Sequence, residues 1–144
     1  MGIGAAVAAA ETAPERKVFT LVGDGGFILN LGELATMVQE RANMVIILMN
    51  DQRYGVIRNI QDAIYGSRHC YVELHTPDYA KLSESLGLRH ALVSDLKDFA
   101  AVLDGALNQP GPFLLEVDML SVGSFNTQFA GPPNSETKHQ KASA

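Results

Sequence analysis

Two short acidic motifs, each placed directly after an apolar run, constrain this chain more than any other feature. Residues 18–22 are β-branched and apolar, and Gly23-Asp24-Gly25-Gly26 follows them at once. Residues 44–49 form a second continuous apolar run, which leads into Asn50-Asp51. Such runs are typical of buried strands, so both motifs are expected at strand ends.

The segment between the two runs predicts a helix. Asn30 is a residue type that caps helices, and Glu33 can complete a capping box. Apolar residues then recur at helical spacing to about residue 41. Strand, helix and strand in this order predict a βαβ unit whose two strands are parallel.

In such a unit, Asp24 and Asp51 lie at the carboxyl edge of the sheet, where open α/β sheets bind ligands. Neighbouring strands are roughly 4.8 Å apart, so two unpaired carboxylates would repel each other. Mg²⁺ would relieve this repulsion, because it prefers carboxylate, carbonyl and phosphate oxygens. The glycines allow a ligand to approach the backbone, and a helix N-terminus favours an anion. The pattern therefore predicts a metal ion that bridges carboxylates to a phosphorylated cofactor.

The remainder of the chain continues the alternation of helices and strands. Residues 78–86 and 96–107 predict helices, whereas residues 88–93 and 112–117 predict strands. The predicted fold class is α/β, a doubly wound and mostly parallel sheet with helices on both faces.

Length and composition narrow the function classes. We expect one domain over residues 1–120 and an extended or disordered tail over residues 121–144. A net charge of −5 without a basic cluster argues against nucleic acid as a partner. The small apolar segment 2–11 is too short to cross a bilayer and has no basic start, so no membrane partner is expected. The single cysteine, Cys70, excludes an internal disulfide and fits the cytoplasm.

The paired motifs carry a resemblance to a known family. Gly23-Asp24-Gly25, with Asn50-Asp51 after a gap of 24 residues, resembles the GDG…NN signature of thiamine-diphosphate enzymes. The resemblance covers about residues 4–119, including 33–36, 54–55, 78–82 and 112–117. The chain is similar to the C-terminal thiamine-diphosphate-binding domain of the acetolactate synthase and benzoylformate decarboxylase superfamily, and its beginning looks truncated against that pattern.

The resemblance implies a site for thiamine diphosphate and Mg²⁺. Asp24, Asp51 and the backbone carbonyl of Arg53 would ligate the metal. The implied cofactor-binding residues are Gly23, Asp24, Gly25, Gly26, Phe27, Asp51, Tyr54, Gly55 and Val56. Asp51 departs from the family's asparagine; it keeps an oxygen ligand but adds a negative charge near the diphosphate.

The resemblance also implies a small 2-oxo acid as substrate, with Val56 and Ile60 presented to it. The alternative is that both side chains simply pack a helix face. Acetohydroxyacid synthases carry a tryptophan at the position of Ile60, so this residue counts against that carboligation. Decarboxylation (a lyase) and carboligation (a transferase) both stay open, as do the identity of the 2-oxo acid and the presence of a flavin domain.

No catalytic residue is assigned to this chain. Enzymes of this type activate the cofactor with a glutamate from a pyrimidine-binding domain, which we expect from another subunit of a homodimer or homotetramer. The chain is thus predicted to be a fragment or one subunit of a split enzyme, inactive in isolation.

A non-catalytic cofactor-binding or structural α/β subunit is the alternative. A nicotinamide-binding Rossmann domain is disfavoured, because Asp24 stands where the pyrophosphate would lie.

Overall fold

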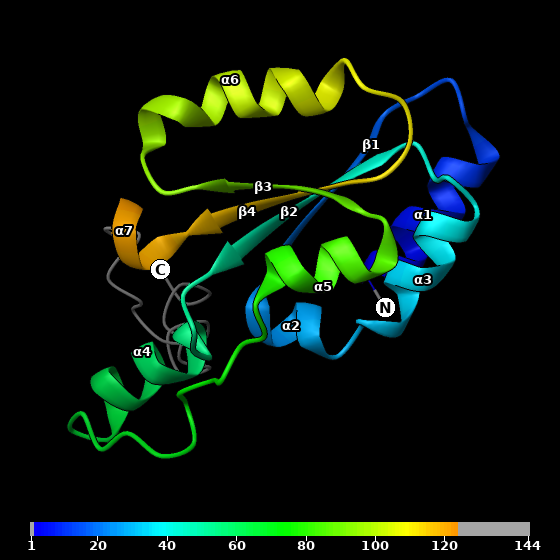
Figure 1. Ribbon diagram of the computed structural model, residues 1–144. Helices are drawn as coiled ribbons and strands as arrows, with labels where there is room; N and C mark the ends of the chain where they lie inside the picture. Colours follow the sequence, from blue (N-terminus) through cyan, green and yellow to red (C-terminus); the bar gives the residue numbers. More distant parts are fainter. Residues whose placement is uncertain (1, 124–144) are drawn as a thin grey trace, which may run out of the picture.

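The computed structural model describes residues 2–123. A four-stranded parallel sheet forms its centre (Figure 1). In chain order the strands are β1 (Val18–Gly23), β2 (Met44–Asn50), β3 (Arg89–Val93) and β4 (Phe113–Asp118). Their spatial order is β1-β2-β4-β3, so the last strand lies between the second and the third. All three neighbouring pairs are parallel, which confirms the predicted α/β class.

Helices cover both faces of the sheet, as predicted. One face carries α1 (Gly2–Thr12), α2 (Asp24–Ile28), α3 (Gly32–Gln39) and α5 (Tyr79–Leu86), whereas α6 (Leu96–Leu107) covers the other (Figure 1). The short α7 (Met119–Val122) follows β4, and α4 (Gly55–Ile64) projects below the carboxyl edge of the sheet. Within residues 2–123, no helix has the length and apolar character that a membrane span requires.

Each face of the sheet has its own apolar core. The core under α1, α3 and α5 contains fully buried side chains such as Phe27, Leu34 and Leu48. The core under α6 contains Val45, Ala106 and Leu115. β2 and β4 contribute to both cores, which explains why their sequences are mainly apolar. These two central strands hold the carboxyl edge in place.

The helix predicted between the two apolar runs is confirmed as α3, but its N-cap is Leu31, without a capping side chain, instead of Asn30. A short helix that the sequence did not predict, α2, precedes it. Asn30 instead donates its side-chain amide to the Gly26 carbonyl at 2.8 Å, at the end of α2. A polar side chain that bonds back to the preceding turn competes with its capping role.

The predicted domain boundary falls inside α7, since this helix includes residues on both sides of position 120. Residues 124–144, most of the predicted tail, lie outside the described residues. The division into a domain and a tail therefore stays a prediction.

Gly87 ends α5 in a left-handed conformation, with φ of 68°. The N–H of the next residue, Leu88, donates to the Ser83 carbonyl at 2.9 Å, as in a Schellman motif. A side chain at position 87 would strain this turn. Gly105 provides a matched contrast, since it lies inside α6, where an added Cβ would meet only open space.

We predict that Gly87→Ala lowers the free energy of unfolding by about 1 kcal/mol, because L-residues disfavour the left-handed region. Gly105→Ala should raise it by about 0.5–1 kcal/mol, because alanine is the better helix former. Urea denaturation measures both changes. Equal effects of the two substitutions would contradict the assigned role of Gly87.

Candidate functional site at the carboxyl edge of the sheet

The ends of β1 and β2 bring the two predicted acidic residues to the same edge. Gly23 of β1 pairs with Met49 of β2, and the chain continues into Asp24 on one strand and Asn50-Asp51 on the other. Asp24 is the first residue of α2 and is only 1% exposed. Asp51 directly follows β2 and is half-buried.

One carboxylate oxygen of Asp24 is satisfied and the other is not. Oδ1 accepts a hydrogen bond from the Gly25 N–H at 2.8 Å, whereas the buried Oδ2 has no hydrogen-bond partner among residues 2–123. A buried, unpaired carboxylate oxygen is costly, so it indicates a group that the site is built to receive.

The electrostatics of the pair are unfavourable in the absence of a cation. Burial raises the pKa of the Asp24 carboxyl, and the charge of Asp51 raises it further, against the opposing Gly25 N–H. Burial also raises the pKa of Asp51, while the Arg53 guanidinium opposes the rise. A bound cation would favour the ionised form of both groups.

Close packing disfavours a side chain at Gly25 of the first motif and at Gly55 after the second motif, because either Cβ would displace a neighbouring side chain. A Cβ on Gly25 would lie 2.4 Å from Cε1 of Tyr54, and a Cβ on Gly55 would lie 2.6 Å from Oδ2 of Asp51. Both distances are shorter than any ordinary contact. The first motif and the segment after the second are thus in direct contact through Tyr54.

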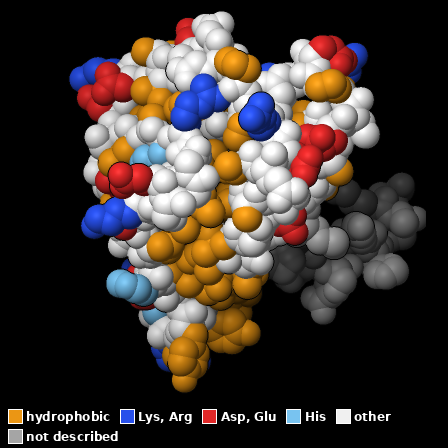
Figure 2. Space-filling view, turned by 45° about the vertical axis from the view of Figure 1, so that its right-hand side comes forward, with side chains coloured by type: hydrophobic (Ala, Val, Ile, Leu, Met, Phe, Trp, Pro, Cys, Tyr) orange, Lys and Arg blue, Asp and Glu red, His pale blue; other side chains and the backbone are white. Residues whose placement is uncertain are grey.

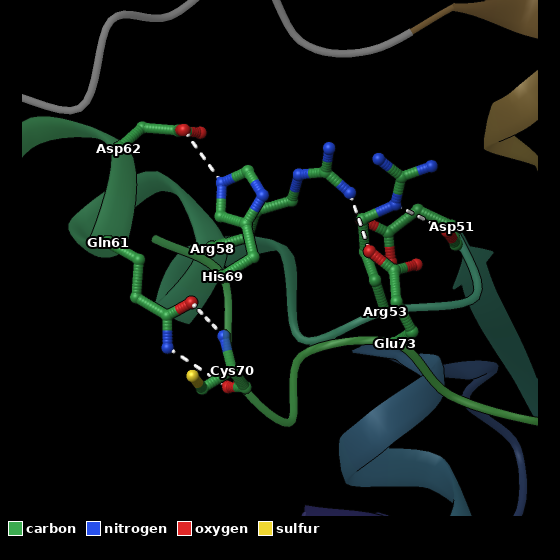
Figure 3. A network of polar contacts seen from close by, with 8 residues as sticks. All are labelled: Asp51, Arg53, Arg58, Gln61, Asp62, His69, Cys70 and Glu73. Carbon is green, nitrogen blue, oxygen red and sulfur yellow. Dashed lines mark hydrogen bonds and ion pairs between the residues drawn. The ribbon is translucent and has the colours of Figure 1, made fainter. Parts of the chain in front are cut away.

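The segment after Asp51 is held by backbone hydrogen bonds. Gln52 has a positive φ of 55°, and its carbonyl accepts the Leu74 N–H at 2.9 Å. The Tyr54 N–H donates to the Val72 carbonyl at 2.7 Å. Arg53 donates from Nε to the Asp51 carbonyl at 2.9 Å (Figure 3).

A polar network fastens the following loop onto α4 (Figure 3). Arg58 pairs with Glu73 at 2.6 Å, and His69 contacts Asp62 at 2.7 Å. Gln61 donates its side-chain amide to the Cys70 carbonyl and accepts the Cys70 N–H. His69 and Cys70 are therefore surface residues that belong to a structural network.

α4 has an apolar side that nothing in the described part of the chain covers. None of its residues is buried; Val56 is 62% exposed, and Ile60 is half-buried. Apolar side chains gather at the lower end of the molecule in Figure 2, the end that α4 occupies in Figure 1. The substrate role of Val56 and Ile60 and the alternative that both simply pack a helix face therefore stay predictions.

Comparison with known proteins decides the family. The family model described as "Thiamine pyrophosphate enzyme, C-terminal TPP binding domain" matches residues 1–117. The chain belongs to this family. The TPP-binding domain is 30% identical over 141 residues to the acetolactate synthase large subunit of Pyropia yezoensis, covering 90% of this chain and 24% of that protein. It is 32% identical over 119 residues to the isozyme 2 large subunit of Escherichia coli K12, covering 82% and 22%.

A solved structure agrees with the sequence comparisons. The thiamine diphosphate-dependent 4-hydroxybenzoylformate decarboxylase of Rhodococcus jostii RHA1 superposes with a TM-score of 0.75 and 30% identity. The match covers 81% of this chain and 22% of that chain. The TPP-binding domain thus spans about a quarter of the length of these relatives.

The structure places the predicted residues of the TPP-binding domain in one region. Gly23 to Phe27 run from the end of β1 through α2, and Asp51 to Val56 run from the end of β2 into α4. The Phe27 side chain is fully buried and packs edge to face on Tyr79, with 5.3 Å between ring centroids. Only the Phe27 backbone is left for its predicted cofactor contact.

Sequence reasoning missed a polar cluster beside this region. Glu116 of β4 is 8% exposed and bonds Asn50 and His90, from the two neighbouring strands. A hollow of about 550 Å³ opens on the cluster and is also lined by Tyr79 and Leu92. The one signal in the sequence is a carboxylate inside the apolar run of residues 113–117.

The raised pKa of Asp24 predicts a pH-dependent effect of Asp24→Asn. Because the folded-state pKa lies above the unfolded value, ionising Asp24 lowers the stability of the metal-free protein as the pH rises. Asp24→Asn should therefore raise the free energy of unfolding at pH 7, and this gain should shrink as the pH falls toward about 3.8. Denaturation across this pH range measures the difference. A gain that grows on acidification would contradict the unpaired carboxylate.

Proposed function

We propose that this chain is the diphosphate- and Mg²⁺-binding part of a thiamine-diphosphate-dependent enzyme that acts on small 2-oxo acids as a decarboxylase or carboligase. The observation that carries the proposal is the unpartnered, buried Oδ2 of Asp24 beside Asp51, at the joint edge of two parallel strands. Membership of the TPP-binding family supports the choice of cofactor.

The donor set fits Mg²⁺ that is shared with a phosphate ligand. Within residues 2–123, no group of three or more His, Cys, Asp or Glu side chains is placed to hold a metal. Two carboxylates would therefore need further oxygen donors, which the Arg53 carbonyl, the diphosphate and water can supply. Mg²⁺ usually keeps several bound waters and binds through one or two carboxylates plus phosphates. A site with two carboxylates therefore matches the usual coordination of Mg²⁺.

When bound, thiamine diphosphate supplies the carbanion-stabilising chemistry of the reaction. In the proposed mechanism Asp24 and Asp51 would hold the metal, and the backbone amides of residues 25–27 would bind the diphosphate. Tyr54 keeps the first motif in place through its contact with Gly25. Val56 and Ile60 offer apolar surface to the substrate and help to exclude water from the reacting atoms.

The exposed apolar side of α4 is a surface suited to packing against a second domain that would close the site. We propose a pyrimidine-binding domain, supplied by another subunit of a homo-oligomer, which brings the activating glutamate. The reaction then requires both domains, and this chain alone is inactive. The exposed thiol of Cys70 agrees with a reducing compartment, for which we propose the cytoplasm.

The names of the relatives do not choose between the two reaction types, since one is a synthase and the other a decarboxylase. Ile60 in place of the tryptophan of acetohydroxyacid synthases favours decarboxylation. Release of carbon dioxide from pyruvate and benzoylformate, compared with formation of an acetohydroxy acid, separates the two reactions.

We predict that Asp24→Ala abolishes Mg²⁺-dependent binding of thiamine diphosphate in the intact protein without unfolding this domain. Asp24 would be a metal ligand, and its Oδ1 accepts a hydrogen bond from the N–H of the adjacent Gly25. Isothermal titration calorimetry measures the affinity, and circular dichroism monitors the fold. Asp104→Ala, an exposed aspartate on α6, is the control. Unchanged cofactor affinity of Asp24→Ala would refute the proposed site.

Asp51 provides an independent prediction. Asp51→Asn restores the ligand usual in the family and should retain activity, because an amide oxygen can still coordinate Mg²⁺. Asp51→Leu removes every oxygen and should lose both cofactor binding and turnover. Carbon dioxide release, measured with cofactor and Mg²⁺ in excess, compares the two variants. Identical behaviour of both variants would show that Asp51 is not a ligand.

A further inference from the structure

Glu116 is an acidic residue in an environment that disfavours charge. It lies in β4, where its neighbours in sequence, Leu115 and Val117, are almost fully buried. Burying an ion costs several kcal/mol unless its partners compensate. An apolar side chain of similar volume at this position would avoid the cost, so a role beyond packing is indicated.

Both oxygens of the Glu116 carboxylate are engaged. Oε1 accepts the side-chain N–H of Asn50 at 2.7 Å, and Oε2 lies 2.9 Å from Nε2 of His90. In the register of the sheet, Glu116 pairs with Leu48 of β2 and Leu92 of β3. Asn50 and His90 are each two residues from these positions and share the face of Glu116. The carboxylate is thus fixed from both sides.

The hydrogen bond between Glu116 and Asn50 fixes the residue that directly precedes the proposed metal ligand Asp51. Asn50 is the last residue of β2 and is 7% exposed, and Asp51 is the next residue. On the far side of Asp51, the carbonyl of Gln52 accepts the Leu74 N–H, and Arg53 forms a β-bridge with Glu73. Asp51 therefore lies between two anchored points, of which Glu116 provides one.

We propose that Glu116 is a positioning residue for Asp51, acting through the side chain of Asn50, with His90 orienting the carboxylate. The inference rests on the proposed function, because it takes Asp51 as a Mg²⁺ ligand. Residues that orient metal ligands typically change metal affinity by 10–100-fold when they are replaced. Glu116 makes no contact with the metal in this proposal and is not a catalytic residue.

The test is Mn²⁺ binding to the intact protein with thiamine diphosphate present, measured by electron paramagnetic resonance of the free ion. Glu116→Ala should weaken Mn²⁺ binding by about 10-fold or more. Glu116→Gln keeps an oxygen that accepts the Asn50 N–H and should restore most of the affinity. Val117→Ala is the matched control, since Val117 is the next residue of β4, is 2% exposed and faces the other core. It should lower thermal stability and leave Mn²⁺ affinity unchanged.

Asn50→Ala tests the same hydrogen bond from its other end, in case Glu116→Ala does not fold. It should reproduce the loss of affinity. Where Glu116→Ala folds, combining it with Asn50→Ala should cost little more than either substitution alone, because the two residues act as a pair. Wild-type Mn²⁺ affinity in both Glu116→Ala and Asn50→Ala overturns the inference, and so does an equal loss in Val117→Ala. If the wild-type protein itself binds no Mn²⁺, or if Asp24→Ala binds it normally, the proposed function fails and the inference fails with it.

Discussion

The parallel pairing of β1 with β2 forces two carboxyl groups onto one edge of the sheet, and the site depends on this constraint. Asp24 and Asp51 follow strands that are hydrogen-bonded neighbours, and burial raises the pKa of both. Among the described residues, no group donates a hydrogen bond to Oδ2 of Asp24. The fold therefore keeps an unfavourable charge arrangement that a cation would make favourable, as functional sites often do at the expense of stability.

The two apolar cores allow this arrangement to persist. β2 and β4 are covered on both faces, and β1 is joined to β2 along its whole length. Because a close-packed interior resists deformation, the strand ends cannot move apart to reduce the repulsion. The close contact of the buried Gly25 with Tyr54 also holds the two motifs together.

Much of the fold and of the site could be predicted from local sequence. The apolar run at residues 44–49 identifies a strand that is covered on both faces, and the run at residues 112–117 does the same although it contains Glu116. Sequence reasoning missed the short helix α2. It also placed the N-cap of α3 at Asn30 instead of Leu31, because Asn30 suits a cap as well as the bond to Gly26 that it makes. The Glu116 cluster was missed for a different reason. Its partners come from β2 and β3, and sequence spacing does not reveal that β4 lies between them.

The strand order also has a consequence for biosynthesis. The central pair of the sheet joins residues that are more than sixty positions apart, since Asn50 pairs with Asp118. Within residues 2–123, β3 has no neighbour in the sheet other than β4. Until β4 has left the ribosome, the apolar flank of β2 is open and β3 has nothing to pair with. The domain must therefore stay incomplete for most of its translation, when an open strand edge invites chaperone binding or misassembly.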